Sequence, residues 1–337
     1  MAKIDVAIIG VSGYTGLELM KILINHPHFN ITYIATTEGG MKATELHPSL
    51  LGVFEQEVLK ADARDVAKHA KLAFLALPHK AAMGFAKELL ALHVKVVDLS
   101  ADYRLELEAY EEHYCEHEDK ENLKEAVYGL PEINRAKIKQ AKLVANPGCY
   151  PTASILGILP FLNYLKKDAP IFIDAKSGVS GAGKKPTSTA HFVSINENIF
   201  AYNPLKHRHE PEIAEKLRLV SGHPFEVNFV PHLLPVSRGM LVSSYLQTND
   251  IIDAKAVLQD FYKNEHFVRI REVPVDIKST AGTNFCDIFV SQKGKSLFVS
   301  SSIDNLLRGA SAQAVVNANL MCGFEESAGI PIIAYVP

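Results

Sequence analysis

Residues 4–16 read IDVAIIGVSGYTG, an apolar run that leads into three glycines, Gly10, Gly13 and Gly16. Apolar residues with little alternation, rich in β-branched side chains, are typical of a strand buried on both faces of a parallel sheet. The next residues, LELMKILINHP, are mostly apolar and end at Pro27, which predicts a buried helix. The chain therefore opens with a strand, a glycine turn and a helix.

The same alternation continues along the first 145 residues. Further strands are expected at residues 31–35, 72–76 and 94–99, with helices near 62–70 and 80–92, and KLVAN (142–146) reads as a last strand. Strands that alternate with helices predict a Rossmann-type, doubly wound parallel sheet in an α/β protein. A charged stretch, 105–142, precedes that last strand, and we expect it to form surface helices.

Beyond residues 146–148 the pattern changes, which places a domain boundary there. Longer strands with fewer helices between them favour an α+β domain with a mostly antiparallel sheet. We expect these strands at 170–178, 225–233, 240–248, 268–277, 286–294 and 296–303, before a closing helix over 305–324. The expected domains are 1–147, completed by 305–337, and a catalytic and oligomerisation domain over 148–304.

Composition narrows the class of partner. The 337 residues are 47% hydrophobic and 22% charged with a net charge of −3, which excludes a disordered chain and does not favour nucleic acid or anionic membrane. A small-molecule partner is the default. The four cysteines lack metal-ligand spacing, and we see neither a signal peptide nor an apolar run long enough for a membrane span. We therefore expect free thiols, no metal and a cytoplasmic location.

The glycine turn predicts a dinucleotide site, because glycines after a first strand let a pyrophosphate approach the free N–H groups at a helix start. The end of the second strand should lie near the adenosine ribose. There, Thr36, Thr37 and Lys42 would suit the 2′-phosphate of NADP, whereas Glu38 would suit the free hydroxyl of NAD. These residues alone leave the choice open.

The sharpest chemical signal is NPGCYPTA, residues 146–153. Pro151 suits the first turn of a helix, so Cys149 should lie at or just before that helix's N-terminus. Free N–H groups and the helix dipole favour a thiolate there, which makes Cys149 a stronger nucleophile than a buried thiol. The other cysteines, Cys115, Cys286 and Cys322, lie in apolar or acidic surface contexts.

A nucleophilic cysteine needs a base, and KHRHEPEI (206–213) is the segment that groups histidines with other polar chemistry. Pro211 suggests a helix start, so we expect His207 and His209 in the loop before it. Anion-binding candidates are the small-residue loop 180–185 and the arginines Arg104, Arg208 and Arg238.

Together these motifs resemble the N-acetyl-gamma-glutamyl-phosphate reductase family from start to finish. The matching segments are GVSGYTGLEL, LHPSL, FLALPH, VVDLSADYR, YGLPE, NPGCYPTA, SGVSGAG, HRHEPEI, PHLLPVSRG and DNLLRGASAQAVVNANL. The resemblance implies an arginine-biosynthesis enzyme that reduces N-acetyl-glutamyl 5-phosphate to the semialdehyde with NADPH and releases phosphate. It also implies a homotetramer.

The resemblance assigns roles to individual residues. Cys149 would be the nucleophile, with His209 and His207 as the acid/base pair. Cofactor contacts would come from Gly10, Ser12, Gly13, Tyr14, Thr15, Gly16, Thr36, Thr37, Ser180, Gly181 and Asn305. Substrate contacts would come from Ser180, to which we add Arg104, Arg208 and Gly183 from the anion-binding candidates above. Two positions depart from the family pattern: the loop after the second strand lacks an arginine that many members carry, and Arg308 stands where a lysine is common.

Other readings stay open at this point. Aspartate-semialdehyde dehydrogenase shares the expected architecture and cysteine chemistry, although HRHEPEI argues against it. An N-acetyl-aminoadipyl-phosphate reductase would differ by one methylene of substrate. A Cys/His hydrolase or acyltransferase without a nucleotide would leave the glycine turn unexplained, and a catalytically silent NADP sensor would have no need of an activated Cys149.

Overall fold

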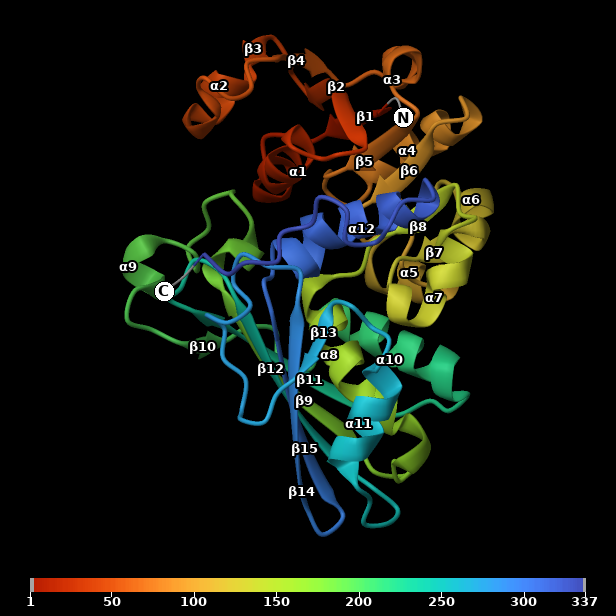
Figure 1. Cartoon of the computed structure of the whole chain (residues 1–337), viewed down its shortest axis with the longest axis vertical. Coiled ribbons are helices and arrows are strands. Elements are labelled where there is room, and N and C mark those ends of the chain that lie inside the picture. The colour runs from red at the N-terminus through yellow and green to blue at the C-terminus, as the bar shows by residue number, and fades with distance from the viewer. Residues whose placement is uncertain (1–2, 336–337) are drawn as a thin grey trace. The chain divides into compact units, whose positions relative to one another are not determined.

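The computed structural model describes residues 3–335, which form two compact units (Figure 1). Unit 1 comprises residues 3–147 and Ala310–Ile330, and unit 2 comprises Gly148–Gly309 and residues 331–335. The return to unit 1 thus begins at Ala310 rather than at residue 305. Residues 331–335 stay with unit 2 because Asn284 N donates to Pro331 O (2.9 Å) and Tyr335 N to Ala281 O (3.3 Å).

Unit 1 is built on an eight-stranded sheet in the order β3-β4-β2-β1-β5-β6-β8-β7. All neighbours in it are parallel except the short pair β3 and β4. Its strands are β1 (Ile4–Ile9), β2 (Phe29–Thr36), β3 (Met41–Lys42), β4 (Glu57–Lys60), β5 (Leu72–Leu75), β6 (Lys95–Asp98), β7 (Val127–Tyr128) and β8 (Leu143–Ala145). The expected Rossmann-type parallel sheet is confirmed.

Strand β1 lies at the point where the strand order reverses, with β2 on one side and β5 on the other. In open α/β sheets this is where ligands bind, outside the carboxyl ends of the strands. The last four residues of β1 are fully buried, as their apolar character predicts. The helices of the unit are α1 (Tyr14–Ile24), α2 (Ala43–Leu46), α3 (Ala63–His69), α4 (Ala81–Ala91), α5 (Leu107–His113), α6 (Lys120–Glu125), α7 (Pro131–Ile138) and α12 (Ala312–Met321), with the 3₁₀ turn η1 (Pro48–Leu50).

Unit 2 is built on a seven-stranded sheet in the order β10-β11-β9-β12-β15-β14-β13. Four of its six strand pairs are antiparallel, so the sheet is mostly antiparallel as expected. The strands are β9 (Ile171–Gly178), β10 (Phe200–Ala201), β11 (Val227–Leu234), β12 (Met240–Gln247), β13 (Val268–Ile270), β14 (Cys286–Lys293) and β15 (Ser296–Ile303).

Helices α8 (Cys149–Ile158), α10 (His209–Ser221) and α11 (Ala254–Tyr262) pack on one side of this sheet (Figure 1). Helix α8 lies against the sheet centre, and every residue in it after Cys149 is buried. The remaining elements are α9 (Phe192–Ile195), the 3₁₀ turns η2 (Leu159–Tyr164) and η3 (Val179–Ala182), and a π-helical turn, η4 (Leu307–Ser311).

Two elements differ from the sequence prediction. The strand expected at 268–277 stops at Ile270, because the next residues run through Pro274 into a turn in which the carboxylate of Asp276 accepts Ser279 N (2.8 Å). The closing helix expected over 305–324 begins as the π turn η4 before α12. Among residues 3–335, no helix is both long and apolar enough to cross a membrane.

Candidate active site

Cys149 is the first residue of α8, and Pro151 is the third. The first four N–H groups of a helix have no partner within the helix, so a proline there removes no hydrogen bond. Gly148 precedes the helix in an extended conformation, and no side chain caps this end. Cys149 is half-buried between the fully covered Gly148 and Tyr150. The thiol therefore sits where the sequence predicted, at the positive end of a helix dipole.

Glu212 secures the turn that presents this thiol. Its side chain is 1% exposed, and its Oε1 accepts a hydrogen bond from Gly148 N at 3.0 Å. Thr152 holds the other end of the turn, since its Oγ1 donates to Gly148 O (2.8 Å). The sequence analysis did not single out Glu212, although it lies in the HRHEPEI segment. Its partner is 64 residues away, so no local pattern could reveal the contact.

His209 begins α10, which corrects the expectation that both histidines precede that helix. Pro211 is the third residue of α10 rather than its start, as Pro151 is in α8. The candidate nucleophile and the candidate base thus each occupy the first position of a helix. Helices α8 and α10 pack together, so both helix starts belong to one part of unit 2.

His207 lies before α10, as expected, and orients His209. Its Nδ1 accepts the backbone N–H of His209 at 3.1 Å, so the ring proton of a neutral His207 resides on Nε2. The His207 and His209 rings are 4.9 Å apart, and both lie edge-on to the Tyr150 ring. Burial, with the nearby Arg208 charge, lowers the pKa of His207 to about 4. His207 is therefore neutral at physiological pH.

Two tyrosines connect the histidines to the thiol. Tyr202 Oη donates to Tyr150 Oη (3.1 Å), and the Tyr202 ring packs against His207. Burial raises the pKa of both phenols, and the nearby charge of an ionised Cys149 raises them further. Both tyrosines are thus neutral hydrogen-bonding groups close to Cys149.

The loop expected to meet nicotinamide and substrate is joined to the same cluster. The side chain of Ser177, at the end of β9, hydrogen-bonds to that of Tyr150. Gly181 packs on Ser177 so closely that a Cβ on Gly181 would lie 2.9 Å from Ser177 Oγ. Asn305 Nδ2 donates to Ser180 Oγ (2.9 Å). Unit 2 therefore brings Ser180, Gly181 and Asn305 together, although Asn305 was expected to belong to the first domain.

The substrate candidates of unit 2 have different surroundings. Arg208 is exposed directly before α10, and Gly183 is exposed with a φ of +84°. Arg238 is instead mostly covered, with its Nε 3.2 Å from an oxygen of Asp304. His232 pairs with Asp174 on the sheet (3.1 Å), consistent with a structural role.

The three glycines of the unit 1 turn, Gly10, Gly13 and Gly16, differ in how closely they are packed. Gly10 has a φ of +96°, and a Cβ there would lie 2.2 Å from Ala76 O. A Cβ on Gly16 would lie 2.4 Å from Gly10 O, whereas one on Gly13 would meet nothing closer than 4.0 Å. No side chain caps α1. Close packing at Gly10 and Gly16, open space at Gly13 and an uncapped helix start fit a pyrophosphate.

Three further cofactor candidates flank the open side of this turn. Ser12 and Tyr14 are exposed, and Thr15 O accepts a hydrogen bond from Ser311 Oγ (2.9 Å). His47, which the sequence analysis did not assign, supports the turn from inside. Its buried Nε2 donates to Val11 O at 2.6 Å.

Thr36 and Thr37, which were expected near the adenosine ribose, differ in their exposure to solvent. Thr36 is buried, and its Oγ1 accepts the backbone N–H of Gly39 (3.0 Å), so this hydroxyl shapes the turn after β2. Thr37, Glu38 and Lys42 are exposed. The expectation of a direct cofactor contact therefore fits Thr37 better than Thr36.

Arg104 is 6% exposed and donates to two backbone carbonyls, Nε to Asn146 O and Nη2 to Leu99 O, both at 2.8 Å. A substrate contact was expected of this side chain. Through the bond to Asn146 O, Arg104 also holds the backbone two residues before Gly148. Among residues 3–335, no group of three or more His, Cys, Asp or Glu side chains could hold a metal ion.

Comparison with known proteins agrees with this architecture. Residues 5–141 match the family model "Semialdehyde dehydrogenase, NAD binding domain", and residues 149–305 match "Semialdehyde dehydrogenase, dimerisation domain". The fold is similar to solved aspartate semialdehyde dehydrogenases. The Vibrio cholerae enzyme has a TM-score of 0.74 at 16% identity and covers 96% of this chain and 99% of its own. The Candida albicans enzyme, solved with NADP, has a TM-score of 0.69 at 12% identity over 95% of this chain and 99% of its own.

Sequence relatives are much closer. The N-acetyl-gamma-glutamyl-phosphate reductase of a Sulfurovum species is 63% identical over 99% of this chain and 100% of its own length. That of Wolinella succinogenes is 60% identical over the full length of both chains. These matches confirm the resemblance drawn from the motifs. They separate the chain from the aspartate-semialdehyde enzymes, whose likeness at 12–16% identity is one of fold. The chain belongs to the N-acetyl-gamma-glutamyl-phosphate reductase family.

Proposed function

We propose that the protein reduces N-acetyl-glutamyl 5-phosphate to N-acetyl-glutamate 5-semialdehyde and phosphate through a thioester on Cys149, as a step of arginine biosynthesis. The observation that carries the proposal is the half-buried Cys149 at the start of α8, next in the chain to Tyr150, whose ring lies edge-on to the histidine pair at the start of α10. The NAD-binding family match and the open glycine turn disfavour a nucleotide-free hydrolase or acyltransferase.

In the first half-reaction, Cys149 Sγ forms a bond to the acyl carbon and the bond from that carbon to the phosphate oxygen breaks. The α8 N-terminus favours the attacking thiolate. His209 accepts the thiol proton and returns it to the departing phosphate. The neutral His207 holds the His209 backbone through Nδ1, and Glu212 holds the Gly148 backbone, so both reacting groups start in place.

In the second half-reaction, the thioester carbonyl is reduced. Gly10, Gly13, Gly16 and Thr37 of unit 1 would hold the dinucleotide, which supplies a hydride when bound. In unit 2, Ser180, Gly181 and Asn305 would face the substrate. His209 donates a proton from water to the carbonyl oxygen. It takes a proton back as the carbon–sulfur bond breaks, so Cys149 is regenerated with release of the aldehyde.

The activity is tested in the reverse direction, which avoids the unstable acyl phosphate. We expect N-acetyl-glutamate semialdehyde to reduce NADP only when phosphate is present. Aspartate semialdehyde and the N-acetyl-aminoadipate analogue, which is one methylene longer, serve as matched comparisons. Reduction without phosphate, or faster reduction with either comparison substrate, would contradict the assigned reaction.

For the cofactor, we propose NADP(H) over NAD(H). Exposed Thr37 and Lys42 offer a hydroxyl and a cation to a 2′-phosphate, whereas exposed Glu38 would repel it. We expect a higher kcat/KM with NADPH than with NADH, a preference reduced by Lys42→Ala and increased by Glu38→Gln. Equal efficiency with both cofactors in the unmodified enzyme would refute this assignment.

We also propose a homotetramer that uses the face of the unit 2 sheet opposite α8. Phe172, Tyr245 and Phe298 lie side by side on β9, β12 and β15, and the first two are 52% and 51% exposed. They line a hollow of about 480 Å³. A second copy suits this row, because the matching family model describes a dimerisation domain. Light scattering should give four times the chain mass, and Tyr245→Glu should lower it. An unmodified protein of one-chain mass would exclude the assembly.

A further inference from the structure

The turn after β15 is organised by one buried carboxylate, Asp304, which is 0% exposed. Its Oδ1 accepts the backbone N–H groups of Leu306 (2.8 Å) and Leu307 (3.0 Å). Its Oδ2 accepts Gly282 N (2.7 Å) and lies 3.2 Å from Arg238 Nε. Both carboxylate oxygens are therefore engaged, by three backbone N–H groups and by the Arg238 cation.

The backbone of Asp304 sets the shape of the same turn. Its carbonyl accepts Gly309 N at 2.9 Å, a bond across five residues that is the hydrogen-bond spacing of a π-helix. Single π turns insert one extra residue and recur at functional sites. Here the side chain and carbonyl of Asp304 together cap the π turn η4 at its start.

The π turn carries Gly309 against the nucleophile. A Cβ on Gly309 would lie 2.6 Å from Cys149 Cβ and 3.1 Å from Cys149 Cα, distances at which one of the groups must shift. The backbone of the π turn therefore packs directly against Cys149, and position 309 has no room for a side chain. Any movement of the turn changes the space available to the thiol.

Two of the residues that contact Asp304, Gly282 and Arg238, also contact Tyr335. Gly282, which donates to Asp304, packs on Tyr335 so closely that a Cβ would lie 2.5 Å from the Tyr335 ring. The Arg238 guanidinium lies 5.9 Å from the centre of that ring. Burial raises the pKa of Asp304, and Arg238 with the three amides opposes that rise by favouring the carboxylate.

We propose that Asp304 is a positioning residue for Cys149, which it serves by holding the π turn that carries Gly309 against the thiol. The role rests on the proposed function of Cys149 as nucleophile. Asp304 contacts neither substrate nor cofactor in this scheme. It acts through Gly309, and its removal should alter the reactivity of the thiol rather than the fold alone.

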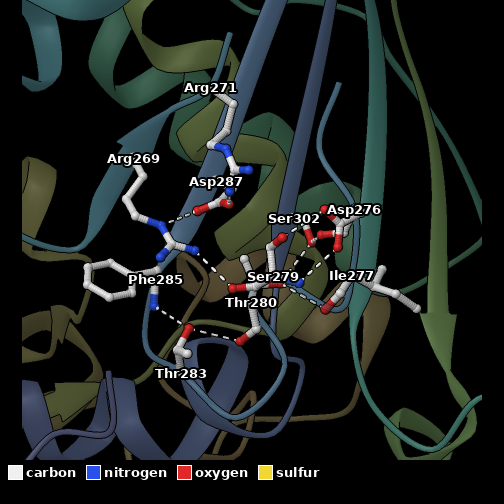
Figure 2. Close-up of polar contacts among 10 residues, drawn as sticks. All are labelled: Arg269, Arg271, Asp276, Ile277, Ser279, Thr280, Thr283, Phe285, Asp287 and Ser302. Atoms are coloured by element: carbon white, nitrogen blue, oxygen red, sulfur yellow. Dashed lines mark hydrogen bonds and ion pairs between the residues drawn. The ribbon is translucent and has the colours of Figure 1, made fainter. Parts of the chain in front are cut away.

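The chain contains a matched control, Asp287 (Figure 2). Asp287 is also 0% exposed and in unit 2, and its carboxylate binds Arg269 Nε (2.6 Å) and Arg271 Nη1 (2.5 Å). Figure 2 shows its surroundings, in which Arg269 Nη2 also donates to Ser279 O (2.9 Å). Asp304→Asn and Asp287→Asn make the same chemical change, and in each the new amide would face an arginine.

The test measures the rate at which iodoacetamide alkylates Cys149, which needs no substrate, together with the rate of phosphate release on mixing with acyl phosphate. We expect Asp304→Asn to slow both by about 10- to 100-fold, the order that an ångström-scale misplacement costs. Asp287→Asn should lower the free energy of unfolding but leave both rates within twofold of the unmodified enzyme. Equal rates in the Asp304 variant, or equal slowing in both variants, would overturn the proposal.

Gly309→Ala provides a second route if Asp304→Asn does not fold. Its methyl group would press on Cys149 directly, so we expect the same slowing of alkylation without loss of the Asp304 contacts. An unchanged alkylation rate in a folded Gly309→Ala protein would also overturn the proposal. Alkylation of Cys149 needs no substrate, so it tests the role of Asp304 by itself. Failure of the proposed reaction would show instead as an unmodified enzyme that releases no phosphate from the acyl phosphate.

Discussion

Replacing Cys149 with serine should reduce turnover by about 10⁴-fold or more, the order of loss when a covalent nucleophile is removed. Serine preserves the size of the side chain at the first position of α8, so the variant should fold and bind NADP. Its hydroxyl, unlike a thiol with an ordinary pKa near 8.5, is essentially never ionised at neutral pH. Steady-state kinetics measures the loss of turnover, and a fluorescence titration measures whether NADP still binds.

The other thiols provide the controls. Cys286 is fully buried on β14, and Cys115 lies 3.6 Å from the hydroxyl of Tyr110 in unit 1. Cys115→Ser should retain activity. Iodoacetamide at neutral pH should label Cys149 before Cys115, Cys286 or Cys322 and inactivate the enzyme in proportion. A Cys149→Ser variant with full activity would eliminate the thioester mechanism.

Replacing His209 with alanine should lower kcat by about 10²- to 10⁴-fold, the range for losing a general acid or base. NADP binding should be nearly intact. His207→Ala should affect kcat less and substrate affinity more, because His207 supports the backbone of His209 rather than carrying the proton. If His207→Ala instead shows the larger loss of kcat, the two roles are exchanged.

The pH dependence separates the histidines in a second way. The pKa of His207 is lowered to about 4, so it stays neutral and does not titrate between pH 5 and 9. Any limb of the kcat/KM profile in that range should therefore persist in His207→Ala, and its loss in that variant would contradict the roles assigned to the two histidines. His207 also links stability to pH. Because its pKa is lower in the folded chain than the unfolded value of 6.5, folding stability is lost as the pH falls from about 6.5 towards 4.

The sequence predicted those helices and strands whose apolar pattern matches the burial of their residues in the structure. The apolar residues of β1, the glycine turn and the strands β9, β12, β14 and β15 were all predicted close to their observed bounds. Cys149 was also predicted to lie at or just before the start of α8, because Pro151 limits where a helix can begin. The same argument placed the start of α10 two residues late, since a proline is tolerated throughout the first turn and not only at its first residue.

The supporting residues of the site could not be predicted in this way. Glu212, His47 and Asp304 are single polar residues whose side chains bind backbone groups elsewhere in the fold, 64 residues away for Glu212 and 36 for His47. For Asp304, the decisive partner Gly282 comes from the loop before β14. A hydrogen bond to a distant backbone amide or carbonyl leaves no periodicity in the sequence. Thr36 and Arg104 were predicted to bind ligands, and in the structure their side chains form hydrogen bonds with backbone groups.

The central claim is the covalent step at Cys149, and its most direct test omits the reductant. The enzyme is mixed with N-acetyl-glutamyl phosphate without NADPH, released phosphate is measured, and the intact protein is weighed by mass spectrometry. We predict a burst of up to one phosphate per site and an added N-acetyl-glutamyl group that peptide mapping places on Cys149, both absent from Cys149→Ser. A reductase that turns over with NADPH yet shows neither burst nor adduct would contradict the thioester mechanism.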